Sequence, residues 1–261
     1  MSDAIRIEIR DRVAVLTLAR PENGNAIDQD MADALLRAAL ICESDDAVRA
    51  LLLTGDGAAF CVGGDVKAFA AAGSDMPALV RRLTASLHMA VARLARMDKP
   101  LVTAVNGAAA GAGFGLAILG DVALAARSAK FAMAYGALGL TPDAGATWLL
   151  PRLVGFRQAQ RLALCNERID AAEAERIGLI THAVDDAALA TEAFALARTL
   201  AQGPRRAFAR TRELLNQSLS NGLETQLELE AQAIARAAGL PEGQAGVAAF
   251  AARRKPAFDA I

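Results

Sequence analysis

Two glycine-rich segments have the composition of loops that hold an anionic oxygen through backbone amides. The first contains Gly63-Gly64-Asp65, and the second is Gly111-Ala112-Gly113-Phe114-Gly115. Each stands between an expected strand and an expected helix, where backbone N–H groups lack partners within the helix. Two such loops that converge on one carbonyl oxygen would form an oxyanion hole and stabilise the negative charge that develops there.

A dinucleotide-binding loop fits the second segment less well than an oxyanion hole does. Such a site requires the pattern G-x-G-x-x-G, but residue 116 is Leu116 and no acidic residue closes a plausible following strand. An NAD-binding oxidoreductase is therefore disfavoured. Close packing of a helix on a sheet would also need small residues at 111–115. Asp65 by its position is better explained as a helix cap than as a catalyst.

Three side chains could move a proton, and each could also be purely structural. Asp143 follows Thr141-Pro142, and a cap, a proline and an acid in the first turn are ordinary features of a helix start. His88 lies among apolar neighbours on an expected helix, where a single histidine is usually packed. Tyr135 is the only tyrosine, and it could orient Asp143 or simply pack in a pocket.

Composition excludes several classes of protein. The chain has 28 basic and 29 acidic side chains, a net charge of −1, and 54% hydrophobic residues. We therefore expect neither a nucleic-acid binder, nor a membrane-surface protein, nor a disordered chain. The three cysteines and two histidines form neither a disulfide framework nor a metal-binding motif. The polar N-terminus has no apolar signal core, which predicts a cytoplasmic protein.

A strand-rich first half and a helical last quarter predict an α/β protein with a helical C-terminal appendage. Residues 101–126 are almost wholly apolar and long enough to consider as a membrane span. Asn106, Asp121 and five glycines favour a buried strand, a tight loop, a buried helix and a second strand instead. The expected strands elsewhere are a hairpin of 5–9 and 13–18 and a strand at 51–53. Helices are expected at 28–42, 65–72 and 77–97, after Pro142 and from Asp170. From 187 onward the chain is expected to be helical, with breaks at 203–204, 220–222 and 239–243.

Three motifs, in this order and spacing, resemble the crotonase superfamily, that is, the enoyl-CoA hydratase/isomerase family. They are Phe60-Cys61-Val62-Gly63-Gly64-Asp65, Lys99-Pro100 with Ala104-Val105-Asn106-Gly107-Ala108-Ala109-Ala110-Gly111-Ala112-Gly113, and Gly139-Leu140-Thr141-Pro142-Asp143-Ala144-Gly145. The resemblance runs from Ile5 to about Phe258. It implies a spiral of β-β-α turns over residues 1–200 and a C-terminal helical trimerisation region over 201–261.

The resemblance also implies what the protein binds. Family members act on acyl-CoA thioesters and form homotrimers or dimers of trimers. Coenzyme A enters as part of the substrate, and no permanently bound cofactor or metal is implied. The two amides of the family's oxyanion hole match Gly64 and Ala112. Lys67 follows the first loop, and Lys255 and Phe258 look like the family residues that help to cover the CoA adenine from a neighbouring subunit.

The reaction depends on the acid and base residues, which vary within the family. The two glutamates of enoyl-CoA hydratases match Gly115 and Tyr135, so the usual hydratase apparatus is missing. Residues 138–152 are similar to the 1,2-epoxyphenylacetyl-CoA isomerases of aerobic phenylacetate degradation. In these and in dienoyl-CoA isomerases, an aspartate at the place of Asp143 is the base.

The resemblance therefore predicts an acyl-CoA isomerase that shifts a double bond or rearranges a ring epoxide. The spacing of His88, Tyr135 and Asp143 also matches the His, Trp and Asp of 4-chlorobenzoyl-CoA dehalogenases. In that branch the aspartate attacks the ring and the histidine activates water. A hydratase, a dehalogenase-like hydrolase and a non-catalytic acyl-CoA-binding relative remain the alternatives.

Overall fold

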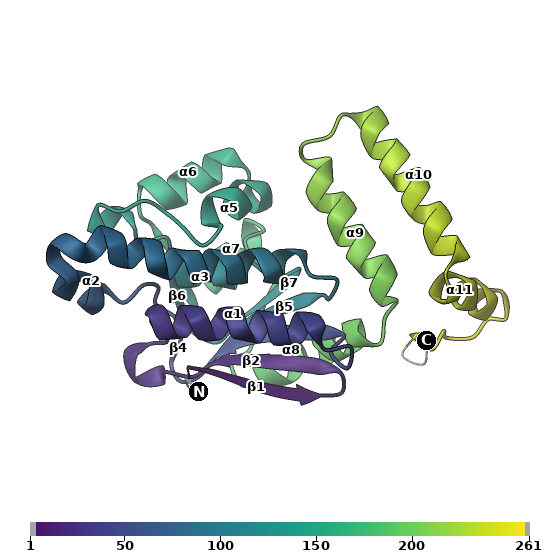
Figure 1. Cartoon of the computed structure of the whole chain (residues 1–261), viewed down its shortest axis with the longest axis horizontal. Helices are drawn as coiled ribbons and strands as arrows, with labels where there is room; N and C mark the ends of the chain where they lie inside the picture. The colour runs from purple at the N-terminus through teal and green to yellow at the C-terminus, as the bar shows by residue number, and fades with distance from the viewer. Residues whose placement is uncertain (1–3, 259–261) are drawn as a thin grey trace.

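Two sheets form the centre of the molecule in this computed structural model, which describes residues 4–258 (Figure 1). The larger sheet has six strands in the order β1-β2-β3-β5-β7-β10, and the smaller has four in the order β4-β6-β8-β9. The strands of the larger sheet are β1 (Ile5–Arg10), β2 (Val13–Leu18), β3 (Ala50–Gly55), β5 (Leu101–Val105), β7 (Val122–Ala126) and β10 (His182–Val184). Those of the smaller sheet are β4 (Ala59–Cys61), β6 (Ala108–Ala110), β8 (Lys130–Ala132) and β9 (Arg168–Asp170).

The chain winds through both sheets as a repeated turn. After the antiparallel β1–β2 hairpin, strands β2, β3, β5, β7 and β10 pair in parallel. Strands β3, β5 and β7 are each followed by a short strand of the smaller sheet, and β4, β6 and β8 also pair in parallel. Helices α2 (Val66–Ala72) and α3 (Met76–Arg96) close one turn, and α4 (Ala112–Ala117) closes the next. The expected spiral of β-β-α turns is confirmed.

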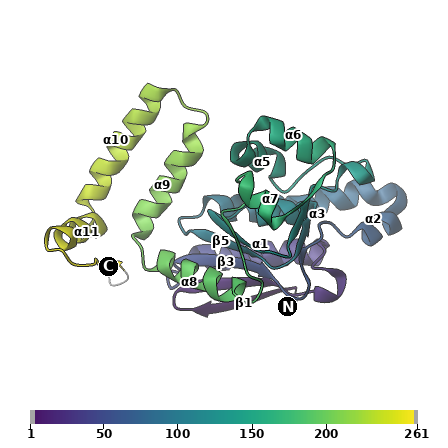
Figure 2. The ribbon, with the colours of Figure 1, turned by 180° about the vertical axis from the view of Figure 1, so that it is seen from behind.

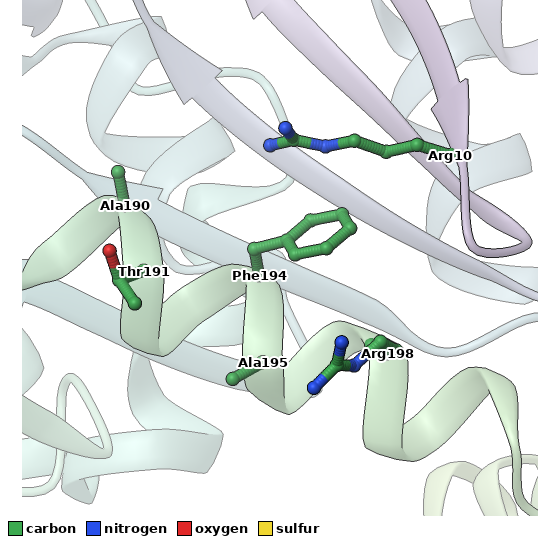
Figure 3. A pocket seen from close by; sticks show the side chains of 6 residues that line it. All are labelled: Arg10, Ala190, Thr191, Phe194, Ala195 and Arg198. Carbon is green, nitrogen blue, oxygen red and sulfur yellow. The ribbon is translucent and has the colours of Figure 1, made fainter.

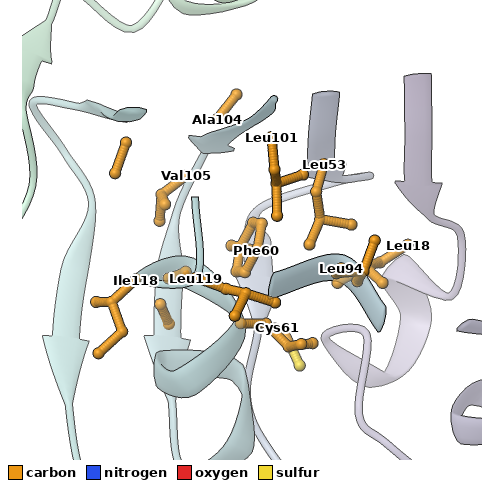
Figure 4. Close-up of a cluster of buried hydrophobic side chains, with 14 of the residues drawn as sticks. Leu18, Leu53, Phe60, Cys61, Leu94, Leu101, Ala104, Val105, Ile118 and Leu119 are labelled. Atoms are coloured by element: carbon orange, nitrogen blue, oxygen red, sulfur yellow. The ribbon is translucent and has the colours of Figure 1, made fainter. Parts of the chain in front are cut away.

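The core is one apolar cluster, to which both sheets and the helices that cover them contribute side chains. All five residues of β5 are buried, as expected for a parallel strand covered on both faces. Phe60 and Cys61 from the smaller sheet pack in the same cluster as Leu53 and Leu101 from the larger sheet (Figure 4). Because a close-packed core resists displacement, the ends of β4 and β6 are held in fixed positions.

The helices cover this core from two sides. Helix α1 (Gln29–Ser44) packs on α3, while α8 (Leu189–Ala201) packs on β3 and β5. The predicted helix caps are present. The Asp28 carboxylate accepts a hydrogen bond from the Met31 amide at 2.8 Å, and Asp65 caps α2 through the amides of Lys67 and Ala68. Asp170 likewise caps α7 (Ala171–Arg176).

Three C-terminal helices stand apart from the sheets in both views (Figures 1 and 2). They are α9 (Arg205–Ser218), α10 (Leu223–Gly239) and α11 (Pro241–Ala251), and no residue of α9 or α10 is buried. Arg212 joins α9 to the core: its Nε lies 2.6 Å from Asp121 Oδ1, and its other nitrogens donate to the carbonyls of Leu94 and Lys99 near the end of α3. Within residues 4–258 no helix combines the length and apolarity needed to cross a membrane.

The structure departs from the predicted elements in two respects. Strands β4, β6, β8, β9 and β10 have three residues each, too few for a pattern of alternation to be visible in the sequence. The helix expected directly after Pro142 starts only at Ala146, as α5 (Ala146–Val154), which is followed by α6 (Phe156–Leu164). Asp143 therefore lies in a turn ahead of the helix.

Candidate active site

The first glycine-rich loop, residues 61–65, leaves β4 and runs alongside residues 24–27. The Ile27 amide donates to the Gly63 carbonyl at 2.7 Å, and the Asp65 amide donates to the Ile27 carbonyl at 3.1 Å. Ile27 and Gly64 thus form a parallel bridge. In such a ladder the residue between these two bonds directs its own N–H to the opposite side. The Gly64 amide is therefore turned away from Ile27.

The second loop, residues 111–115, links β6 to α4. The amides of Phe114 and Gly115 both donate to the Gly111 carbonyl, so the Ala112 amide, which precedes them in the first turn, has no partner within the helix. A Cβ atom at Gly63 would lie 2.8 Å from the Ala110 oxygen and 3.3 Å from the Ala112 nitrogen. These two amide loops, residues 61–65 and 111–115, are therefore in contact, and the candidate residues Gly64 and Ala112 lie on adjoining loops.

Asn25 binds the segment 56–60 that precedes the first amide loop. This role was not predicted from the sequence. Asn25 is fully buried, with a left-handed backbone at φ 58°. Its side-chain nitrogen lies 2.9 to 3.1 Å from the carbonyl oxygens of Asp56, Ala59 and Phe60, and its oxygen accepts from the Arg20 amide at 2.9 Å. The turn sequence Asn23-Gly24-Asn25 was the available signal, because asparagine tolerates the left-handed region.

The proposed base lies in the carboxylate segment, residues 133–145. The Tyr135 hydroxyl donates to Asp143 Oδ1 at 2.6 Å, and His88 Nε2 lies 3.6 Å from Asp143 Oδ2. Burial, with the Asp143 charge as a further cause, raises the pKa of Tyr135 well above its ordinary value. The phenol therefore remains protonated and acts as a donor to the carboxylate. The structure thus brings His88, Tyr135 and Asp143 together.

The prediction that Asp143 lies in the first turn of a helix is wrong. Helix α5 begins at Ala146 with Gly145 at its N-cap, and no side chain caps it. The Asp143 carboxylate instead points to Tyr135 and His88, and its exposed fraction is 24%. Thr141 and Pro142 lie in a loop without regular secondary structure, and the left-handed residues Ala144 and Gly145 turn the chain before the helix begins.

Gly115 connects the carboxylate segment to the second amide loop. A Cβ atom at position 115 would lie 2.8 Å from the Ala144 oxygen and 3.0 Å from the Ala144 Cβ. Position 115 therefore cannot carry a larger side chain unless the turn next to Asp143 moves. Gly115 lies three residues, about one helical turn, after Ala112 on α4. The contact at Gly115 therefore places residues 143–144 close to the start of α4.

A large cavity of about 2090 Å³ opens beside His88, between helices α3 and α5 and the C-terminal helices. Gly145, Trp148 and Phe258 also line it. The candidate CoA-binding residues are not assembled within one chain. Lys67 is exposed on α2 and Lys255 is exposed beyond α11, and these two helices lie at opposite ends of the molecule in both views (Figures 1 and 2).

The Cys61 thiol is not suited to nucleophilic attack. Cys61 is the first residue of the first amide loop, and its buried thiol donates to the Asn25 carbonyl at 3.1 Å. Burial raises the pKa of Cys61 to about 12, so it remains a thiol and not a nucleophilic thiolate. In the range 4–258 no three His, Cys, Asp or Glu side chains gather in a way that could hold a metal ion.

A second, smaller hollow of about 310 Å³ lies between β1 and α8 (Figure 3). The Arg10 guanidinium stacks 4.0 Å from the centre of the Phe194 ring, and Arg198 lies 3.8 Å from Asp11. None of the candidate site residues lines this hollow. It is therefore separate from the site built around Asp143.

The fold and the site define an α/β spiral with two amide loops and one carboxylate segment, and comparison with known proteins agrees. A sequence model of the enoyl-CoA hydratase/isomerase family matches residues 8–260. The 1,2-epoxyphenylacetyl-CoA isomerase of Escherichia coli is 41% identical over 262 residues, which cover 99% of each chain. A Rhodobacter capsulatus protein named as a probable enoyl-CoA hydratase is 42% identical over 254 residues, 97% of each chain.

Solved structures give the same result. An enoyl-CoA hydratase from Polaromonas sp. JS666 superposes with a TM-score of 0.92 at 33% identity, over 97% of this chain and 98% of that one. The chain belongs to the enoyl-CoA hydratase/isomerase family, and its fold is the crotonase fold. The resemblance predicted from the three motifs is confirmed. The names of these relatives include both isomerase and hydratase.

Proposed function

We propose that this protein is an acyl-CoA isomerase in which Asp143 is the base and the Gly64 and Ala112 amides hold the thioester oxygen. The observation that carries the proposal is the contact between Gly115 and Ala144. By the family resemblance, a hydratase places one glutamate at position 115 and the other at position 135. Here position 115 is a glycine, and the Ala144 turn occupies the space that a side chain there would need. Position 135 is a tyrosine that donates a hydrogen bond to Asp143.

The proposed reaction is a proton transfer that one carboxylate can complete. For a 3-enoyl-CoA, Asp143 removes a proton from the carbon next to the thioester carbonyl, and the electron pair moves to the thioester oxygen. The two amides stabilise that oxyanion, a contribution typically worth about 3–4 kcal/mol for each well-aimed donor. The protonated Asp143 then returns the proton to carbon 4, which leaves the double bond conjugated with the carbonyl.

The same polarised thioester could assist rearrangement of a ring epoxide. The named activity of the E. coli relative favours this version of the substrate. The double-bond assay is the simpler test: a 3-enoyl-CoA is converted to its 2-enoyl isomer and followed by ultraviolet absorbance of the conjugated thioester. Wild-type turnover that disappears in Asp143→Asn supports the proposal. Unchanged turnover in that variant contradicts it.

Two further functions each have one supporting observation. The hydratase names among the relatives favour hydration, and release of 3-hydroxyacyl-CoA from crotonyl-CoA would support it. The proximity of His88 to Asp143 favours a dehalogenase-like hydrolase, and chloride release from 4-chlorobenzoyl-CoA would support that function. Binding of CoA esters with no turnover of enoyl, epoxide or chloroaryl substrates would indicate a non-catalytic relative.

We also propose that helices α9–α11, within the region 201–261, form a trimer interface, with trimers able to pair as hexamers. These helices leave large apolar side chains exposed, among them Leu215 at 66%, Leu223 at 68% and Ile234 at 72%. A surface of this kind favours burial against another chain. Lys67 of one subunit and Lys255 and Phe258 of another would then be able to reach one CoA. Light scattering of the wild type beside Ile234→Lys measures the assembly, and an unchanged mass would contradict the proposal.

A further inference from the structure

The turn that presents Asp143 to the site is held in an unfavourable conformation. Ala144, the next residue, has a left-handed backbone at φ 51° and is fully buried. Residues with a Cβ atom avoid this region, so the surrounding structure must hold the turn in place. Because Asp143 is adjacent to Ala144, any relaxation of this turn would move the carboxylate.

Two contacts hold the turn from opposite sides. Gly115 of α4, which has no side chain, allows the Ala144 carbonyl and Cβ to approach α4 closely. On the other side, the Ala144 amide donates to His88 Nε2 at 3.3 Å. A buried backbone N–H needs an acceptor, and the imidazole supplies one from helix α3. His88 therefore contacts the turn by a hydrogen bond that does not depend on substrate.

This bond sets a requirement on the His88 ring. Nε2 can accept a hydrogen bond only when it carries no hydrogen, so the bond is made by the form of the imidazole that has its hydrogen on Nδ1. The separation of 3.6 Å between Nε2 and Asp143 Oδ2 exceeds hydrogen-bond distance. Tyr135 binds Oδ1, so Oδ2 is the carboxylate oxygen that remains available to a substrate.

From these contacts we infer that His88 is a positioning residue: its neutral imidazole holds the Ala144 amide and thereby aims Asp143, and it exchanges no proton with substrate. The inference rests on the proposed function of Asp143 as base. It differs from the hydrolase mechanism, in which the histidine lone pair would have to activate water. Here that lone pair already accepts the Ala144 N–H.

His88 is well placed for a substitution test because its side chain is 50% exposed and contributes little to the core. In His88→Gln the side-chain oxygen can still accept the Ala144 N–H, but the amide cannot act as a base. In His88→Leu neither function remains. Met89→Leu, at an adjacent position that is 48% exposed, is the matched control on the same helix.

Turnover of 3-enoyl-CoA is measured first, with kcat and KM determined separately. We expect His88→Leu to lower kcat about tenfold to a hundredfold through misplacement of Asp143. His88→Gln should recover most of that loss, with KM within about threefold in both variants. A His88→Gln variant as inactive as His88→Leu would overturn the inference in favour of a proton-transfer role. Full activity in His88→Leu would also overturn it.

Hydrogen–deuterium exchange of residues 140–149 in the substrate-free proteins is the second measurement. Exchange in this segment should be at least about threefold faster in His88→Leu than in the wild type, and close to wild type in His88→Gln and Met89→Leu. Equal exchange in all four proteins would overturn the positioning role. If the wild type isomerises neither an enoyl-CoA nor a ring-epoxide CoA ester, the proposed function fails, whereas this exchange result still decides whether His88 holds the turn.

Discussion

The amide loops and the carboxylate segment form the two halves of the candidate site and are built by different means. The amide loops use backbone groups, placed by the parallel bridge at Ile27 and by the start of α4. The carboxylate segment uses side chains, and it contains two left-handed alanines, Ala134 at φ 62° and Ala144 at φ 51°. In the proposed function, the backbone of the first half polarises a carbonyl, while the reaction depends on the side chains of the second half.

This difference predicts that the largest loss of activity follows from replacement of the Asp143 carboxylate. Asp143→Asn keeps an oxygen that can accept from Tyr135, so the loop should remain folded. Because an amide cannot take the substrate proton, we expect kcat to fall about 10²- to 10⁴-fold with KM nearly unchanged. Ultraviolet assays of 3-enoyl-CoA turnover measure the change, with circular dichroism as the control for folding. A KM effect alone would indicate that Asp143 only binds substrate.

The amide half can be tested without altering any side-chain chemistry. Ala112 is the first residue of α4, a position that tolerates proline because its N–H has no helical partner. Ala112→Pro removes the proposed oxyanion donor, and we expect kcat to fall about 10²- to 10³-fold. Ala112→Gly keeps the N–H and should lose far less. Equal activity in the two variants would show that this amide does not face the thioester.

Tyr135→Phe tests how far the carboxylate half depends on a single hydrogen bond. The variant removes the 2.6 Å donor to Asp143 and leaves the ring in place. A hydrogen bond to a charged group is worth about 1.5–3 kcal/mol, so kcat should fall roughly tenfold to a hundredfold. The thermal unfolding midpoint should change little. Activity equal to wild type would mean that packing alone fixes Asp143.

The smallest expected effect is on stability at acid pH. It should come from Glu173, outside the candidate site. Hydrogen bonds from Arg176 and Arg161 lower the pKa of Glu173 to about 2 from its ordinary 4.5. The lowered pKa means that Glu173 stabilises the folded state above pH 4.5, and that this stabilisation is lost as the pH falls from 4.5 toward 2. Arg161 lies on α6, and a Cβ atom at Gly136 would lie 4.0 Å from the Ala163 oxygen of that helix. Because α6 is thus next to the carboxylate segment, acid should loosen residues 133–145 before the amide loops.

Glu173→Gln is the matched variant for this prediction. It should unfold at a slightly lower temperature than wild type at about pH 7 and at the same temperature near pH 2. The Glu173 side chain is partly exposed to solvent, so screening keeps the difference small. Thermal unfolding at several pH values measures it. A difference that persists near pH 2 would show that the stability effect of the variant does not come from ionisation of Glu173.

Several features of the fold and the site follow from local sequence. The caps at Asp28, Asp65 and Asp170, and the breaks between the C-terminal helices, were predicted and are confirmed. Local signals suffice here because a cap bonds to an amide two or three residues away. The glycine-rich loops were also visible, since strand, glycine and helix follow one another directly in the chain.

The sequence by itself therefore determined the spiral, the family and the presence of two amide loops. Only the tertiary structure decided that Asp143 precedes its helix, that Ala144 packs on Gly115, and that Asn25 supports the first loop. The His88–Ala144 bond joins residues 56 positions apart, and the Asn25–Phe60 bond joins residues 35 apart. Local periodicity carries no information about such contacts, because they form only when the spiral brings distant segments together.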